Sequence, residues 1–346
     1  MLPMTAPSDV RLAALSRWLD ERLAPVPFTL APASADASFR RYFRVTLAAP
    51  HPCAGGATTL IAMDAPPPQE NCRPFVHVAR LLRAAGVNAP DVLAQDVEQG
   101  FLLLTDLGTV TYLAALDADS AHALYLDAID ALIRFQKASR PGELPDYDEA
   151  LLRRELNLFP EWYVARHVQR TLTDAQRASL EGVFAQVLAN NLAQPRVFVH
   201  RDYHSRNLMV TTPNPGVLDF QDAVYGPVTY DLVSLLRDAY VEWSEERQID
   251  WAVRYWERAK AAGIPVDADF GLFWRDFEWM GVQRQVKVLG IFARLCHRDG
   301  KDGYLADMPL VMRYLRSACG RYSALAPLLV LLDALEDRAP VVGYTF

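Results

Sequence analysis

The stretches His200-Arg-Asp-Tyr-His-Ser-Arg-Asn207 and Leu218-Asp-Phe-Gln-Asp222 carry most of the information about the fold of this sequence. Asp202 lies five positions before Asn207, and Asp219 follows twelve residues after Asn207. Short apolar pieces bounded by Pro and Asn adjoin both polar runs, and such pieces are typical of brief β-strands. We therefore expect both runs to form loops beside short strands. The expected strands span Arg196–Val199, Leu208–Val210 and Gly216–Leu218.

This spacing suits phosphoryl transfer, which requires a base beside the attacking hydroxyl and oxygen ligands for Mg²⁺. We predict that Asp202 accepts the hydroxyl proton. Asn207 and Asp219 are the predicted ligands of the magnesium ions that bridge the nucleotide phosphates. The alternative is a capped turn in which the Asn and Asp side chains make ordinary Asx hydrogen bonds. That alternative explains neither the spacing nor the flanking strands.

The residues before these loops predict a β-rich N-terminal part. A helical spacing of leucines over residues 8–24, with Ser8 as its cap, predicts an opening helix. A second helix is expected over Phe75–Ala85, ending at Gly86. The β-type stretches predict a mostly antiparallel sheet. Its expected strands are Phe28–Leu30, Tyr42–Leu47, Thr58–Met63, Asp91–Gln95 and Gly100–Leu104.

The later part of the chain is predicted to be mainly helical, because apolar residues recur there at i, i+3 and i+4. We therefore predict an α+β fold with two lobes. The N-terminal, nucleotide-binding lobe spans residues 1–104, a hinge spans 105–108, and the catalytic and substrate lobe spans 109–346. The expected helices are Tyr112–Lys137, Leu151–Arg166, Asp174–Leu192, Tyr230–Val241, Gln248–Ala262, Phe270–Leu295 and Met308–Leu335.

Composition narrows the classes of function. The chain has 346 residues, 51% of them hydrophobic, and a formal net charge of −7 without long like-charge runs. This length and composition support about two folded domains, and the charge disfavours nucleic acid or anionic lipid as a partner. Four widely spaced cysteines without a C-x-x-C pair indicate free thiols rather than disulfides or zinc ligands. With no signal-peptide pattern, we expect a cytoplasmic protein that binds no membrane.

The motif H-x-D-x-x-x-x-N followed by D-F resembles the aminoglycoside phosphotransferase and choline kinase group, which shares the protein-kinase architecture. Within that group the sequence is similar to bacterial kinases that phosphorylate carbon 1 of N-acetylmuramate and N-acetylglucosamine in peptidoglycan recycling. The resemblance implies a two-lobed protein-kinase-like fold, ATP and Mg²⁺ as cofactors, and a small amino sugar as substrate. The matching stretches are Ala37–Val45, Ala62–Pro67, Leu103–Gly108, His200–Asn207, Leu218–Pro227 and Tyr230–Leu232.

The resemblance also implies supporting roles near the catalytic loop. His200 would brace this loop from behind, and Asp231 would anchor its backbone. For each of these two residues, a plain capping or core-polar role is the alternative. The hinge residues Thr105, Asp106 and Leu107 would contact the nucleotide.

The predicted phosphate-binding hairpin departs from the protein-kinase pattern in two ways. Ser38–Arg44 contains no glycine, so its phosphate contacts would come from Ser38 and the guanidinium groups of Arg40 or Arg44. The third strand, Leu60–Asp64, has no lysine to pair with the phosphates. Strand alternation places Arg40 and Arg44 on the face of Ser38, and Arg41 on the other. A solvated hairpin face is the alternative.

Substrate contacts are harder to assign from sequence. Gln283, Arg284 and Lys287 lie within about one turn of a predicted helix and are candidates to meet a carboxylate or hydroxyls. Gln221 and Asp222, beside the predicted metal ligand, are further candidates. The alternative for the helix residues is a polar face in water. Two other functions stay open, a kinase of another small molecule such as an aminoglycoside or choline, and a kinase-like module without catalysis.

Overall fold

The computed structural model describes residues 9–35 and 39–338, and it divides into two compact units. The first unit comprises residues 1–109 together with 211–221, and the second comprises 110–210 together with 222–346. The chain leaves the first unit next to the predicted hinge. It returns to that unit for residues 211–221, which the sequence assigns to the second lobe. The hinge itself stays a prediction.

A five-stranded antiparallel sheet forms the centre of the first unit, with the strand order β1-β2-β3-β5-β4. The register places Arg44 of β2 opposite Ile61 of β3, and Arg41 opposite Asp64. Because side chains alternate along a strand, Arg41 and Arg44 lie on opposite faces of the sheet, as predicted. The strands are β1 (Phe28–Ala35), β2 (Arg41–Leu47), β3 (Thr59–Asp64), β4 (Val92–Asp96) and β5 (Phe101–Thr105).

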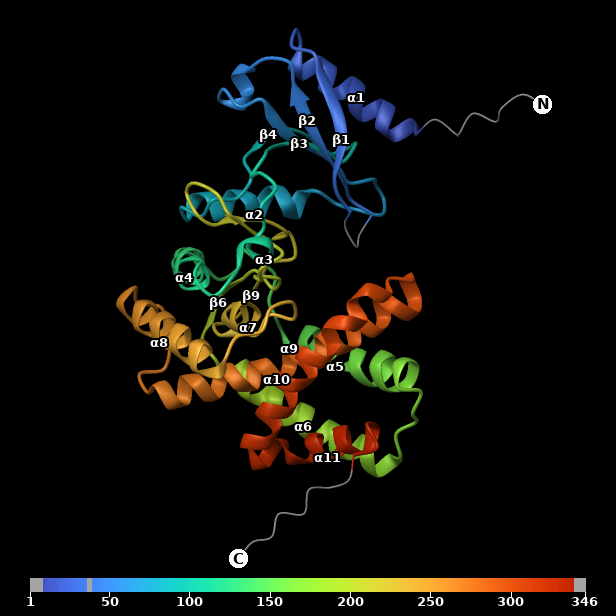
Figure 1. Ribbon diagram of the computed structural model, residues 1–346, viewed down its shortest axis with the longest axis vertical. Coiled ribbons are helices and arrows are strands. Elements are labelled where there is room, and N and C mark those ends of the chain that lie inside the picture. Colours follow the sequence, from blue (N-terminus) through green and yellow to red (C-terminus); the bar gives the residue numbers. More distant parts are fainter. Residues whose placement is uncertain (1–8, 36–38, 339–346) are drawn as a thin grey trace, which may run out of the picture. The chain divides into compact units, whose positions relative to one another are not determined.

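Helix α1 (Val10–Leu23) covers one face of this sheet (Figure 1). Trp18 and Leu19 pack with Val45 and Leu60 in a single apolar core. The N-cap of α1 is Asp9, whose side chain accepts the N–H of Leu12 at 3.0 Å. The predicted cap Ser8 lies outside the described residues. The second helix of this unit, α2 (Arg73–Ala84), carries Phe75, whose ring lies 4.6 Å from that of Phe220.

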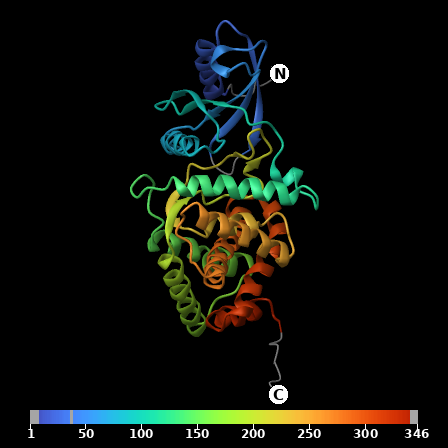
Figure 2. The same cartoon turned by 90° about the vertical axis from the view of Figure 1, so that its left-hand side faces the viewer.

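The second unit is built around the long helix α9 (Phe270–Asp299), which packs against α5, α6, α7 and α10 (Figure 2). A short antiparallel pair, β6 (Arg196–Val199) and β9 (Val224–Pro227), lies in this unit, and the sequence analysis missed β9. The brief strands β7 (Leu208–Met209) and β8 (Gly216–Val217) follow the catalytic loop. The remaining helices are α3 (Tyr112–Ala115), α4 (Ala121–Lys137), α5 (Glu149–Leu158), α6 (Asp174–Ala193), α7 (Tyr230–Leu236), α8 (Glu245–Ala261), α10 (Met308–Arg321) and α11 (Ala326–Leu335).

Three helices that the sequence predicts as continuous are interrupted in the structure. The helix predicted over 112–137 is interrupted where Asp117 accepts the N–H groups of Asp119 and Ser120 at 2.9 and 2.7 Å. The helix predicted over 151–166 changes into a π-helix, Phe159–His167, just before Pro160. Proline lacks the N–H that an α-helical ladder needs. The helix predicted over 308–335 divides into α10 and α11 because the backbone is extended at Tyr322, and Pro327 lies in the first turn of α11.

No helix in the described part of the chain is both long enough and apolar enough to cross a membrane. The four cysteines are free thiols, with Cys72 and Cys319 buried.

Candidate active site

The loop that carries Asp202 runs from β6 to β7 and is held by a buried carboxylate. Asp231, in the first turn of α7, accepts the backbone N–H groups of His200 at 2.6 Å and Arg201 at 2.9 Å. Asp231 is fully buried. Burial raises the pKa of Asp231 to about 7, although the two backbone hydrogen bonds act in the opposite direction. These hydrogen bonds fix the backbone immediately before Asp202.

Further hydrogen bonds fold the loop onto itself. The N–H of Asp202 donates to Nδ1 of His200, whose imidazole is buried, at 3.3 Å. The carbonyl of Asp202 accepts the N–H of His204 at 3.1 Å and Nδ2 of Asn207 at 3.0 Å. Ser205 donates its N–H to Asp238 at 2.9 Å. The position of the Asp202 carboxylate is therefore set by contacts both before and after it.

Asp202 is half-buried among cationic side chains. Burial raises the pKa of its carboxyl, but the charges of Lys287, His204, Arg284 and Arg201 outweigh burial and leave the pKa below its usual value. Asp202 is therefore an ionised hydrogen-bond acceptor at neutral pH. This is the protonation state that a base for a hydroxyl proton requires.

Glu155, on α5, is the centre of a buried ionic cluster beside this loop. Its carboxylate pairs with Arg201, with Nζ of Lys287 at 3.0 Å, and accepts Nε2 of Gln283 at 3.0 Å. The hydroxyl of Tyr147 also donates to it. Burial raises the pKa of Glu155, but the charges of Lys287 and Arg201 outweigh this and lower it. The cluster ties α5, α9 and the loop together.

Arg201 has an unusual backbone conformation for a residue with a side chain, with φ of +77°. The left-handed region costs a non-glycine residue about 1 kcal/mol or more. Two contacts hold Arg201 there, the hydrogen bond from its N–H to Asp231 and the ion pair of its guanidinium with Glu155. The residue before the predicted base is thus held in a strained conformation by buried carboxylates.

The two predicted metal ligands belong to different units, Asn207 to the second and Asp219 to the first. Nδ2 of Asn207 donates to the backbone carbonyl of Asp202. Asp219, at φ +60°, accepts Nε2 of Gln221 at 2.8 Å. Carboxylate and amide oxygens are the donors that Mg²⁺ prefers, so both residues fit magnesium chemically. Among the described residues, no cluster of three or more His, Cys, Asp or Glu is arranged for a metal.

Some of the predicted nucleotide-binding residues of the first unit bind each other. Arg44 donates to Asp106 at 2.7 and 3.2 Å and to the carbonyl of Gly108 at 2.9 Å. The hydroxyl of Thr105 accepts the N–H of Asp91 at 2.9 Å. Leu107 is half-buried, and Arg40 precedes β2. Ser38 lies outside the described residues.

The buried end of β3 carries an acidic residue that the sequence analysis did not single out. Asp64 is fully buried and binds the guanidinium groups of Arg11 and Arg41, while Arg41 also pairs with Asp9. These contacts hold the Arg41 side chain on the face of the sheet that α1 covers. Ile61 lies opposite Arg44 in the strand pair, and β3 contains no lysine.

Comparison with known proteins places this chain in a family. A family model described as a phosphotransferase enzyme family matches residues 29–270. The chain belongs to this family. It is 54% identical to an N-acetylmuramate/N-acetylglucosamine kinase from Pseudomonas putida, over 96% of this chain and 98% of that relative. The sequence-based recognition of the phosphotransferase group is therefore confirmed.

Two solved structures share the fold of this chain. An ADP-bound aminoglycoside phosphotransferase aligns with a TM-score of 0.54 and 14% identity, covering 87% of this chain and 97% of that one. An ethanolamine kinase from Plasmodium vivax aligns with a TM-score of 0.60 and 11% identity, covering 92% and 96%. The predicted two-lobed, protein-kinase-like fold is thus confirmed.

Within this family fold, the three substrate candidates on α9 are buried rather than exposed to water. Gln283 is completely buried against Glu155, and Lys287 donates to the hydroxyl of Tyr230 at 2.9 Å. Nε of Arg284 donates to Oγ of Ser234 at 2.6 Å. The alternative of a solvated helix face is therefore wrong for all three. Of the remaining candidates, Gln221 is buried and Asp222 is exposed.

Sequence reasoning missed Glu155, which organises this part of the site. The signal was present, because Glu155 lies on the apolar side of its helix between Leu152 and Leu156, both fully buried. A carboxylate at such a position must find cationic partners in the interior. The sequence does not say which cations from distant segments supply them.

Proposed function

We propose that this protein transfers the terminal phosphoryl group of ATP to the carbon-1 hydroxyl of N-acetylmuramate and N-acetylglucosamine, in the cytoplasm, as a step of peptidoglycan recycling. The observation that carries the reaction type is Asp202, an ionised carboxylate on a loop whose backbone is fixed on both sides. The choice of sugar rests on the printed name of the relative at 54% identity.

In this proposal Asp202 accepts the proton of the attacking hydroxyl. A carbon-1 hydroxyl belongs to a hemiacetal and is more acidic than an ordinary alcohol, so a carboxylate with a lowered pKa is an adequate base for it. His200 and Asp231 orient the loop rather than react. Because the barrier to phosphoryl transfer falls mainly through positioning and electrostatics, a fixed loop is the main contribution of these residues.

Asn207 and Asp219 would hold magnesium with their amide and carboxylate oxygens. When bound, the ion neutralises charge on the nucleotide phosphates. Thr105, Asp106 and Leu107 are the proposed nucleotide contacts at the hinge, between lobes of residues 1–104 and 109–346. For the phosphates we propose Ser38, Arg40 and Arg44. Arg44 also binds Asp106 and the carbonyl of Gly108, so a contact with phosphate would share its guanidinium with these acceptors.

An ATP-consumption assay with a panel of acceptors tests this function. The panel contains N-acetylglucosamine, N-acetylmuramate, kanamycin and choline, and phosphorus NMR identifies the phosphorylated position. We expect consumption with the two amino sugars and a carbon-1 phosphate product. Consumption only with kanamycin or choline would identify another small-molecule kinase. Consumption with none of the four would support a module without catalysis.

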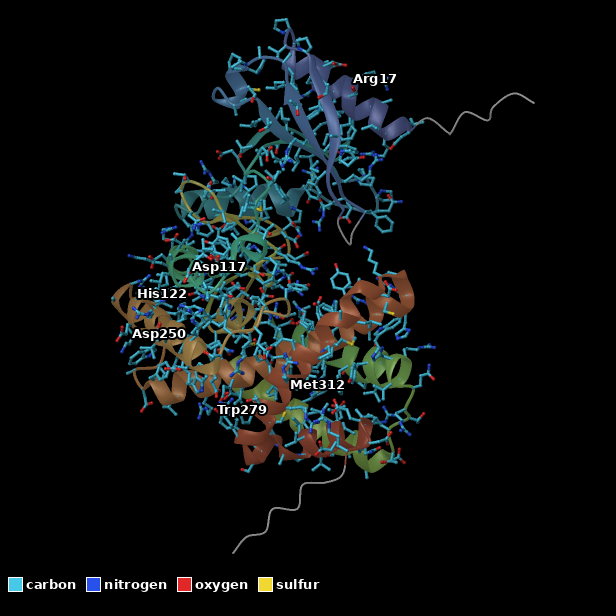
Figure 3. All side chains as sticks on the ribbon, in the orientation of Figure 1. Arg17, Asp117, His122, Asp250, Trp279 and Met312 are labelled. Atoms are coloured by element: carbon cyan, nitrogen blue, oxygen red, sulfur yellow. The ribbon has the colours of Figure 1, made fainter. Side chains whose placement is uncertain are left out.

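The variant Asp202→Asn tests the proposed base. We expect kcat to fall by roughly 10² to 10⁴ while nucleotide binding is retained. Asp250→Asn is the matched control, because Asp250 lies on α8 (Figure 3) and is exposed. It pairs there with Arg254 one turn away. A near wild-type kcat for Asp202→Asn would remove this residue from the mechanism.

A further inference from the structure

Arg206 lies on the catalytic loop, between Asp202 and Asn207, and its surroundings are unlike those of the other cations there. Its guanidinium carbon is 3.6 Å from the ring centroid of Tyr240 and 5.8 Å from that of Tyr304. Its side chain is 43% exposed, and its ion pair with Asp307 is long, at 3.9 Å. Arg206 therefore has a defined position and a guanidinium that a ligand can reach.

The other cationic side chains near Asp202 already bind partners within the protein. Arg201 and Lys287 both pair with Glu155, and Arg284 donates to Ser234. Lys287 and Arg284 are buried, so a ligand cannot reach their charges without opening the core. Among the cationic groups described around this loop, Arg206 is the one suited to meeting an anionic substrate.

The two sugars of the proposed function differ in a single charged group. N-acetylmuramate carries a lactyl ether that ends in a carboxylate, and N-acetylglucosamine has a hydroxyl at that position. An enzyme that accepts both must bind the carboxylate when it is present. It must also avoid a buried, unpaired cation when the carboxylate is absent, because such a charge is strongly destabilising.

Arg206 meets both conditions. With a neutral sugar it keeps water, Asp307 and the two tyrosine rings as partners, so no charge is left unpaired. With an acidic sugar its five N–H donors suffice to bind a second carboxylate in a bidentate manner without releasing Asp307. The flat contact with Tyr240 restricts rotation of the guanidinium and lowers the entropy lost on binding.

We propose that Arg206, stacked on Tyr240 beside Tyr304, binds the carboxylate of the acidic amino sugar and sets the preference for N-acetylmuramate over N-acetylglucosamine. This inference rests on the proposed function and adds the residue that distinguishes its two substrates. The neighbouring Asp202 would act on the hydroxyl of either sugar in the same way.

The test compares kcat/KM for the two sugars in wild type, Arg206→Gln, Arg206→Lys and the control Arg313→Gln. Arg313 forms an exposed ion pair with Glu242 at 2.6 Å, in the same unit. For Arg206→Gln we expect the ratio of kcat/KM, N-acetylmuramate over N-acetylglucosamine, to fall at least about tenfold, mainly through KM. Arg206→Lys keeps the positive charge, so its ratio of kcat/KM should fall less than that of Arg206→Gln. Arg313→Gln should have the same ratio as wild type.

A neutral amide of the lactyl carboxylate provides a second, chemical test, and its first comparison uses wild type alone. Wild type should handle this amide with a higher KM than N-acetylmuramate, and Arg206→Gln should handle both compounds alike, since the two changes remove the same contact. A substrate ratio within about threefold of wild type in Arg206→Gln, or equal discrimination of acid and amide by both enzymes, would overturn the inference. Turnover of neither sugar by wild type would instead refute the proposed function.

Discussion

The variant Glu155→Gln removes the negative charge at the centre of the buried cluster while keeping the shape of the side chain. Arg201 and Lys287 then lose the carboxylate with which they form ion pairs, and the new amide NH₂ faces hydrogen-bond donors. Removing one partner of a buried ion pair costs about 3–5 kcal/mol of the free energy of unfolding. For an m value of about 3 kcal/mol/M, the urea midpoint should fall by about 1 to 1.7 M.

Equilibrium urea denaturation at pH 7, followed by far-ultraviolet circular dichroism, measures this shift. Glu181→Gln is the control, since Glu181 makes an exposed pair with Arg153 at 2.5 Å. Exposed pairs contribute about 0–1 kcal/mol, so the control midpoint should stay near that of wild type. A Glu155→Gln midpoint equal to that of Glu181→Gln would refute the assignment of Glu155 as the charge on which the cluster depends.

The pH dependence of the same experiment follows from the lowered pKa of Glu155. A carboxyl whose pKa is lower in the folded state binds fewer protons there than in the unfolded state. Its stabilisation is therefore complete above the unfolded pKa, about 4.3, and is lost as the pH falls through the folded pKa. The difference between wild type and Glu155→Gln should be largest near pH 7 and shrink below about pH 4.

Two further predictions concern single positions. Asp231→Ala leaves the two backbone N–H groups that Asp231 binds buried without an acceptor. We therefore expect a loss of about 2–6 kcal/mol in the free energy of unfolding. We also expect kcat to fall at least about tenfold, and an unchanged kcat would show that this anchor is not needed for turnover. Gly290→Ala would place a Cβ 2.5 Å from the backbone carbon of Leu158, so thermal unfolding should reveal a clear loss of stability. Gly182→Ala, in open space on α6, is its control and should stabilise slightly.

Much of the fold could be predicted from the sequence, because apolar periodicity records which face of an element is buried. The strands of the first unit and the helices α1, α2, α6 and α9 follow from that pattern. The helix breaks at Asp117 and Pro160 could not be placed from periodicity, since apolar spacing continues across them. The break at Asp117 depends on local hydrogen bonds, and the break at Pro160 depends on the backbone N–H that proline lacks.

The site was less predictable than the fold. The motif selects Asp202, Asn207 and Asp219 as candidates by spacing alone, and their roles stay predictions. The ion pairs join segments that are far apart in sequence, such as Glu155 and Lys287. A single sequence does not show which cation pairs with which anion. The same limit explains why Lys287 and its neighbours on α9, predicted as substrate contacts, prove to be buried and paired.

The conformation of Arg201 has a consequence for how relatives of this protein can differ. A backbone at φ +77° suits glycine, so a chain with glycine at this position needs no compensating contact from α5. Such a chain also has no guanidinium there for Glu155 to neutralise. We therefore expect positions 155, 201 and 287 to change as a set across the family, either with Glu, Arg and Lys together or with glycine at 201 and an apolar residue at 155.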